Sequence, residues 1–324
     1  MKFSRLGAAI LLLIAMNMVV CTGMLQPSAM VYAQERAVDD EIPPFENRLE
    51  TDHFVLKWTN KSYHPRDDIK DPEIIKETAE YLEEAWAKYM DLFGRAPYTA
   101  PGKNKVEVIF RDIDCYGVAD PPDGPIQFSS TAWVDKKTKG IRRPTSAHEL
   151  FHKLQYAYGF KTKWRPPKPY KWFTEGTAAW SEVYVWGMVS RTEKIDELFK
   201  DTNMDFFYEA EDTAMPFWIY FVQGNQEHPN NQLMRKFFEA CERLHDGHLA
   251  LQEVVEETYG PIDRFLDDFA KARKTGFWGG PCDAPYKSIL GPEGTDLVAE
   301  VKDLQRKLSG SRKATSFPFE IRNF

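Results

Sequence analysis

The chain has 324 residues, of which 43% are hydrophobic, 28% charged and 14% aromatic. This composition is typical of an ordinary folded protein, and it excludes disorder, a collagen helix and a coiled coil as descriptions of the whole chain. The formal net charge of −7 argues against nucleic acid as a partner, because binding to phosphates requires a basic surface.

Residues 1–33 have the pattern of a secretory signal peptide. Lys2 and Arg5 give a positive start, an apolar run extends from Leu6 to Val20, and residues 31–33 form a small-x-small cleavage pattern. The apolar run is shorter than the roughly 20 residues that span a bilayer. We therefore expect no stable membrane insertion of the mature chain.

The same leader offers two routes of export. Cleavage near Ala33 predicts a secreted or extracytoplasmic protein. Cys21 resembles the modified cysteine of a bacterial lipoprotein, but Val20 is a poor residue at the preceding position. Cleavage near Ala33 is therefore favoured over lipid anchoring at Cys21.

The cysteines do not predict a disulfide framework. After the leader the chain keeps Cys115, Cys241 and Cys282, an odd number, so at most one bridge forms within the chain. Buried or unpaired thiols explain these residues as well as any pairing does.

The predicted fold begins near Glu50. Residues 34–49 are polar and acidic with two adjacent prolines, and they predict a flexible lead-in. His53 to Thr59 predicts a strand because β-branched and aromatic residues dominate it. Lys105 to Phe110 predicts a second strand because apolar and polar residues alternate over most of its length.

A long helix is predicted between these two strands. Asp71 followed by Pro72 is typical of a helix start, and Gly94 is typical of a helix end. Apolar residues recur at three- and four-residue steps from Ile75 to Phe93. We expect this apolar stripe to lie on the sheet.

The pattern changes from strands to helices after a third strand, which is predicted for Gln127 to Asp135. Helices are predicted from about Thr145 to Tyr158 and from about Thr174 to Met188, joined by the basic, proline-rich loop Lys161 to Lys171. Because strands precede helices, the fold class is α+β. Further helical runs follow at Phe217–Gln223, Leu233–Leu244, Leu249–Thr258 and Ile262–Lys274.

Residues 148–152, with the sequence HELFH, have the pattern H-E-x-x-H within one of these predicted helices. Residues four apart on a helix point the same way, so His148 and His152 can occupy adjacent corners of a Zn²⁺ tetrahedron. Glu149, one step around the helix, can reach a water at the metal and act as general base. An alternative remains, because Ser146-x-x-Glu149 also matches a capping box, in which the histidines are only packed.

A zinc centre of this kind needs a third protein ligand and an open fourth position. Glu175 lies at the start of the next predicted helix, and the small residues Gly176 to Ala179 allow two helices to approach closely. A carboxylate there completes a His₂Glu ligand set. Glu175 can also be an ordinary acid in the first turn of a helix, where the helix dipole favours it.

The sequence HELFH followed by Glu175-Gly176-Thr177-Ala178 resembles the gluzincin superfamily of zinc metallopeptidases, in which a glutamate on a helix after H-E-x-x-H is the third ligand. The wider layout is similar to secreted bacterial metalloproteases distantly like hyicolysin. The resemblance implies one Zn²⁺ per chain, held by His148, His152 and Glu175. It also implies a domain arrangement: a zincin-like peptidase domain at 50–280, with an upper lobe at 50–159 and a helical lobe at 160–280, then a C-terminal extension at 281–324.

The resemblance also implies supporting residues. Thermolysin-like members carry an acid four residues after the third ligand to orient a zinc histidine, and in this chain Ala179 stands there. Glu182, two helical turns after Glu175, is a candidate for that role and can equally be a solvated acid. A tyrosine or histidine usually helps to hold the oxyanion, and the candidates are Tyr184, Tyr208 and Tyr220.

The expected reaction is hydrolysis of a peptide bond in a peptide or protein substrate, with a metal-activated water and Glu149 as the base. Gluzincins commonly bind substrate along an edge strand before the metal helix, and the segment in that place is Ser130-Thr131-Ala132-Trp133. Two other interpretations remain: an exported non-catalytic binding or scaffold protein that retains a zinc site, and a zinc hydrolase for a non-peptide amide or ester. The intact Glu149 argues against the first, because a metal-only role does not require an acid there.

Overall fold

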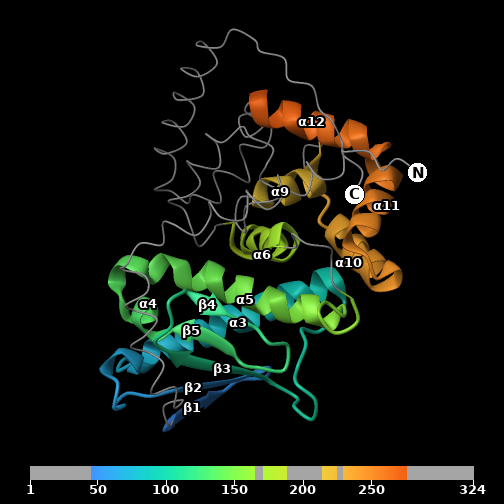
Figure 1. The fold of residues 1–324 in the computed structure, drawn as a ribbon. Coiled ribbons are helices and arrows are strands. Elements are labelled where there is room, and N and C mark those ends of the chain that lie inside the picture. The colour runs from blue at the N-terminus through green and yellow to red at the C-terminus, as the bar shows by residue number, and fades with distance from the viewer. Residues whose placement is uncertain (1–44, 165–170, 188–213, 225–228, 276–324) are drawn as a thin grey trace, which may run out of the picture. The chain divides into compact units, whose positions relative to one another are not determined.

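The computed structural model of the chain describes residues 45–164, 171–187, 214–224 and 229–275 (Figure 1). All described residues fall within one compact unit of the chain, Pro44–Phe324. The predicted signal peptide, Tyr208, Cys282 and the predicted C-terminal extension lie outside the described residues. Within the described residues, no helix combines the length and the apolar character that crossing a bilayer requires.

A mixed five-stranded sheet forms the amino-terminal part of the described chain, and most of the remainder is helical, which confirms the α+β class. The strand order is β1-β2-β3-β5-β4. The three central strands are parallel, whereas β1 and β4 pair antiparallel at the two edges. The strands are β1 (Asn47–Glu50), β2 (Phe54–Trp58), β3 (Val106–Arg111), β4 (Gly117–Val118) and β5 (Ile126–Ser129).

Strand β1 corrects the predicted boundary of the flexible lead-in. Residues 47–49 belong to a strand, in which Asn47 pairs with Trp58 and Glu50 with Val55. Arg48 and Glu50 are exposed, whereas Asn47 and Leu49 are partly covered. A short edge strand with charged outward side chains has the composition of a loop, so its pairing depends on β2 rather than on its own sequence.

Helix α3 (Pro72–Phe93) confirms the long helix predicted from periodicity. The Asp71 carboxylate accepts a hydrogen bond from the backbone N–H of Glu73, and Gly94 ends the helix with a left-handed φ of 62°. Figure 1 shows α3 and α5 on one side of the sheet. The buried side chains of α3 include the predicted stripe Ile75, Ala79, Leu82, Trp86, Tyr89 and Phe93.

The predicted strand at residues 127–135 is wrong in its second half. Strand β5 ends at Ser129, whose side chain accepts a hydrogen bond from the backbone N–H of Ala132 and so caps helix α4 (Ser130–Val134). A serine cap competes with strand propensity and starts a helix instead. Ser130, Thr131, Ala132 and Trp133 are therefore helical and do not offer a strand edge, and the edge next to β5 is formed by β4.

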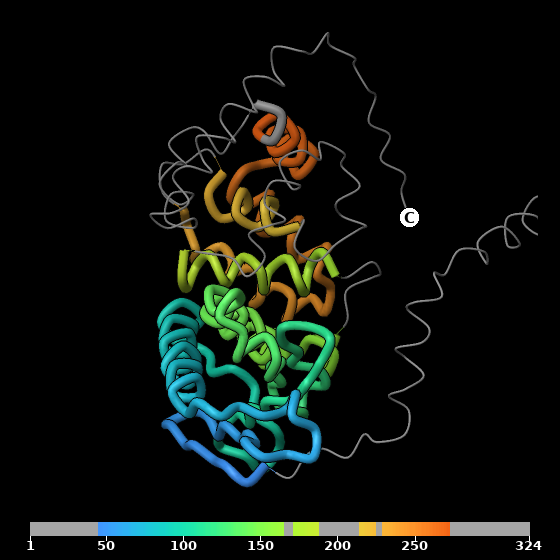
Figure 2. The backbone as a smooth tube through the Cα atoms, turned by 90° about the vertical axis from the view of Figure 1, so that its left-hand side faces the viewer, coloured from blue at the N-terminus to red at the C-terminus, as the bar shows by residue number. Residues whose placement is uncertain are grey.

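The helices that carry the predicted chemistry are α5 (Arg142–Ala157) and α6 (Lys171–Trp186). Helix α6 lies between α5 and α9 (Met215–Gln223) in both views (Figures 1 and 2). Gly176 permits this approach, because a Cβ atom there would lie 2.7 Å from Cβ of Ala214 and 2.8 Å from Nε1 of Trp218. The remaining predicted helices are confirmed as α10 (Gln232–Leu244), α11 (Gly247–Tyr259) and α12 (Ile262–Thr275).

Candidate metal centre

Helix α5 places His148, Glu149 and His152 in its middle rather than at its start. The helix begins at Arg142, and Ser146 is not its capping residue: the Ser146 hydroxyl donates a hydrogen bond to the carbonyl of Arg142 at 2.7 Å. The capping-box alternative is therefore wrong. The helical period turns the two histidines toward α6, where Glu175 lies.

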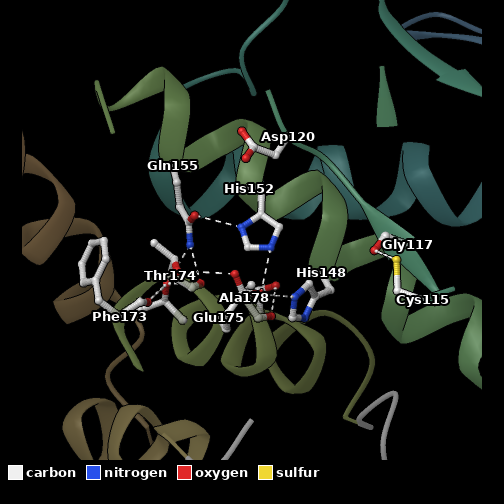
Figure 3. A network of polar contacts seen from close by, with 12 residues as sticks. Cys115, Gly117, Asp120, His148, His152, Gln155, Phe173, Thr174, Glu175 and Ala178 are labelled. Carbon is white, nitrogen blue, oxygen red and sulfur yellow. Dashed lines mark hydrogen bonds and ion pairs between the residues drawn. The ribbon is translucent and has the colours of Figure 1, made fainter. Parts of the chain in front are cut away.

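The three predicted ligands meet between α5 and α6 (Figure 3). Nε2 of His148 and Nε2 of His152 each lie 3.3 Å from Oε2 of Glu175, and all three ligand atoms lie within 4.8 Å of one another. In a tetrahedral zinc centre with bonds of about 2.0–2.1 Å, neighbouring ligand atoms are about 3.3–3.4 Å apart. The two nitrogen–oxygen separations match that edge length, so this group of residues could hold a metal ion.

Both histidines have an acceptor on the ring nitrogen that faces away from Glu175. Oε1 of Glu182 lies 2.7 Å from Nδ1 of His148, and Oε1 of Gln155 lies 3.0 Å from Nδ1 of His152. An acceptor at Nδ1 favours the tautomer that carries its proton there. When such a ring is neutral, the lone pair of its Nε2 is directed at the space shared with Glu175; when the ring is protonated, Nε2 donates to the Glu175 carboxylate instead.

The electrostatics of the cluster favour positive charge. Burial opposes protonation of His148, but its hydrogen bonds to Glu175 and Glu182 outweigh burial and raise its pKa well above the ordinary value. Burial likewise opposes the charge of Glu175, but attraction to His152 and hydrogen bonds from both histidines hold the pKa of that carboxyl well below its usual range. The buried carboxylate and the two imidazoles can therefore bind a divalent cation together.

Glu149 lies beside the ligand group without being one of its members. Its side chain is 5% exposed, and burial raises the pKa of its carboxyl above the ordinary value. The edge strand β4 passes directly over it: a Cβ atom on Gly117 would lie 2.7 Å from Cγ and 2.8 Å from Oε1 of Glu149. Only a residue without a side chain leaves room for the carboxylate at this place.

The structure brings Glu182 to the cluster but holds the described tyrosine candidates elsewhere. Glu182 is 1% exposed and contacts His148, so it is not a solvated acid. The hydroxyl of Tyr184 donates to the carbonyl of Lys88 at 3.3 Å. The ring of Tyr220 packs against Phe265 and Phe269. The third candidate, Tyr208, lies outside the described residues.

Three residues near the cluster were not singled out from the sequence: Gly117, Gln155 and Lys153. Lys153 is 1% exposed, and its ammonium donates to the carbonyls of Pro122 and Gly124 at 2.8 and 2.7 Å, while burial lowers its pKa to about 8. It thereby holds the loop that joins β4 to β5. Gln155 follows His152 by three residues and so shares its helix face, a signal that periodicity contains.

The two described cysteines lie in different surroundings. Cys115 is exposed and its thiol donates to the carbonyl of Gly117 at 3.2 Å, whereas Cys241 is buried within α10. Burial raises the pKa of the Cys241 thiol well above its ordinary value. Cys241 therefore acts as an apolar core residue.

Comparison with known proteins does not identify a family for this chain. No protein-family model matches the chain, and no curated protein matches it significantly. The conclusions about function therefore depend on the arrangement of His148, His152, Glu175 and Glu149.

Proposed function

We propose that the protein is a zinc metallopeptidase of the gluzincin type, with a zincin-like domain over about residues 50–280. The observation that carries this proposal is that Nε2 of His148 and Nε2 of His152 each lie 3.3 Å from Oε2 of Glu175, the separation expected in a tetrahedral centre, with Glu149 beside them. A structural zinc site is closed by four protein ligands, whereas a catalytic site has three and leaves the fourth position open.

The donor set supports zinc as the metal, with one ion per chain. Two imidazole nitrogens and one carboxylate oxygen form a His₂Glu set, which is a zinc combination, whereas Ca²⁺ and Mg²⁺ prefer six or more oxygen ligands. The acceptors at Nδ1 of each histidine agree with this assignment, because they orient the rings and increase the basicity of the metal-binding nitrogens.

Glu149 is the proposed general base and acid. A zinc ion bound to the cluster would lower the pKa of water and polarise the carbonyl group of a peptide bond. Glu149 accepts the proton of the attacking water at its carboxylate and delivers that proton to the departing amine. Burial, which raises the pKa of Glu149, suits a group that must take up a proton and then release it.

The edge strand supports a peptide as the substrate. Gly117 and Val118 form β4, which pairs on one side with β5 and passes over Glu149. An extended peptide that adds to such an edge gains main-chain hydrogen bonds and runs beside the catalytic group. We therefore assign the substrate strand to β4, in place of residues 130–133. The leader of residues 1–33 supports secretion after cleavage near Ala33.

The test uses purified mature protein. We expect about one zinc per chain and hydrolysis of peptides that a chelator abolishes and added zinc restores. Glu149→Gln is expected to keep the zinc and the fold but to lose at least about 10²-fold in rate, the scale of a missing general base. Glu84→Gln changes an exposed acid on α3 in the same way and serves as the control.

Three results would overturn the proposal. Full peptidase activity of the Glu149→Gln variant would contradict the proposed role of Glu149 as general base. Stoichiometric zinc without turnover of any peptide would support the non-catalytic binding protein. Turnover of esters or non-peptide amides alone would identify a hydrolase with another class of substrate.

A further inference from the structure

Gln155 is fully buried and makes three hydrogen-bonding contacts, one to His152 on its own helix and two to α6. Its Oε1 lies 3.0 Å from Nδ1 of His152. Its Nε2 lies 2.8 Å from the carbonyl oxygen of Thr174 and 2.9 Å from Oγ1 of Thr177. The amide of Gln155 therefore connects one predicted metal ligand, His152, to the turn of α6 that contains another, Glu175 (Figure 3).

The partners of Gln155 determine which way its amide faces. A carbonyl oxygen only accepts hydrogen bonds, so the atom that faces Thr174 must be the amide nitrogen. The hydroxyl of Thr177 donates to the carbonyl of Phe173 at 2.7 Å and is left to accept from the same nitrogen. The amide oxygen then faces His152, and because this oxygen can only accept, Nδ1 of His152 must carry the proton.

We propose that Gln155 is a positioning residue that sets the Nδ1-protonated tautomer of His152 and aims its Nε2 lone pair at the metal. This proposal rests on the metal centre of the proposed function, but it does not depend on turnover. Gln155 does for His152 what Glu182 does for His148, with one difference: the amide adds no charge. A carboxylate in its place would be one more negative group in a cluster that already contains Glu149, Glu175 and Glu182.

A purely structural role makes a different prediction from a tautomer-setting role. If Gln155 only joined the two helices, its amide nitrogen would matter, because that atom contacts α6. If Gln155 sets the tautomer, its oxygen matters, because that atom contacts His152. Comparing a substitution that removes the whole amide with one that removes only its nitrogen can therefore distinguish these roles.

Gln155→Met removes both halves while keeping the length of the side chain, and Gln155→Glu keeps the acceptor but removes the donor. We expect Gln155→Met to weaken zinc binding by about 10–100-fold, the scale for a partner of a metal-bound histidine. Gln155→Glu is expected to recover most of that loss, although it places a carboxylate against the carbonyl of Thr174. Thr177→Val removes one contact of the amide nitrogen and the hydroxyl's own hydrogen bond to the carbonyl of Phe173, but leaves the amide oxygen in place. It is expected to lower stability without changing the His152 tautomer.

Nitrogen-15 NMR of the His152 imidazole gives the decisive readout. With zinc bound, Nδ1 is expected to carry a slowly exchanging proton in the wild-type protein, in Gln155→Glu and in Thr177→Val, and to lose that protection in Gln155→Met. The same spectra of the metal-free protein, recorded in alkaline solution where the ring is neutral, are expected to show the Nδ1-protonated tautomer except in Gln155→Met. Urea unfolding of each metal-free variant shows separately how much the fold is weakened.

Equal zinc affinities and equal imidazole spectra in wild type and Gln155→Met would overturn this proposal. Equal losses of zinc affinity in Gln155→Met and Gln155→Glu would also overturn the proposal, because the lost contact of the amide nitrogen with α6 would then explain both. If Gln155→Met does not fold, the metal-free spectrum of Gln155→Glu is used instead. A proton on Nε2 of His152 in that variant would overturn the proposal. A wild-type protein that binds no metal would instead overturn the proposed function, and the metal-free spectra would still decide the role of Gln155.

Discussion

Gly117→Ala tests whether the edge strand β4 lies against Glu149, the proposed general base. The new Cβ atom would lie 2.7 Å from Cγ of Glu149, whereas ordinary carbon–carbon contacts are about 3.5–4.0 Å. The Glu149 side chain must therefore retreat by about 1 Å. A displacement of that size at a catalytic group costs on the order of 10²-fold in rate. Zinc affinity should hardly change, because Glu149 is not among the three ligands.

The assay for this variant compares kcat and KM for a peptide, zinc affinity and urea unfolding. Overpacking typically costs about 1–3 kcal/mol of stability, so the fold is expected to survive. Gly140→Ala is the matched control, because a Cβ atom there meets nothing within 4 Å. A Gly117→Ala enzyme with the wild-type kcat would refute the placement of the base under β4. A loss confined to zinc affinity would show that the strand acts on the ligands instead.

Further predictions concern acids whose environments differ. Glu175→Gln is expected to weaken zinc binding strongly, since a neutral amide replaces a charged ligand. Glu182→Gln is expected to lower zinc affinity by about 10–100-fold. A zinc titration in which Glu182→Gln loses more affinity than Glu175→Gln would exchange the roles of the two acids. Burial raises the pKa of Glu83, but hydrogen bonds from His53 and Thr51 outweigh burial and lower it. The Glu83 carboxylate therefore contributes stability above its unfolded pKa of about 4.3, and that stability is lost as the pH falls through the lower folded value. Glu83→Gln should cost about 1 kcal/mol at neutral pH and nothing in strong acid; urea midpoints that differ equally at both pH values would contradict this.

The helices were predictable because their signals are local. The caps of α3 at Asp71 and Gly94 and its apolar period appear in consecutive residues, and the structure has the same helix. The H-E-x-x-H motif is equally local, since residues four apart share a helix face whatever surrounds them. Even Gln155 could have been singled out in this way, because it follows His152 by three residues.

The strands were predicted less well because their signals depend on partners. Asn47–Glu50 has the composition of a loop and becomes a strand by pairing with β2. Gly117–Val118 is too short to show any alternation, yet it forms the sheet edge beside Glu149. Ser130–Val134, in contrast, has a strand-like composition but follows a serine that caps a helix.

The sequence by itself determined which residues are candidates for the proposed chemistry: two histidines and a glutamate within one short stretch of helix, and a second glutamate on the next helix. Only the tertiary structure decided that Oε2 of Glu175 lies 3.3 Å from both imidazoles, that Glu182 and Gln155 contact the other ring nitrogens, and that β4 covers Glu149. The physical reason is that helix period is a property of neighbouring residues. The distances between α5, α6 and β4, in contrast, are set by the packing of side chains that lie far apart in the sequence.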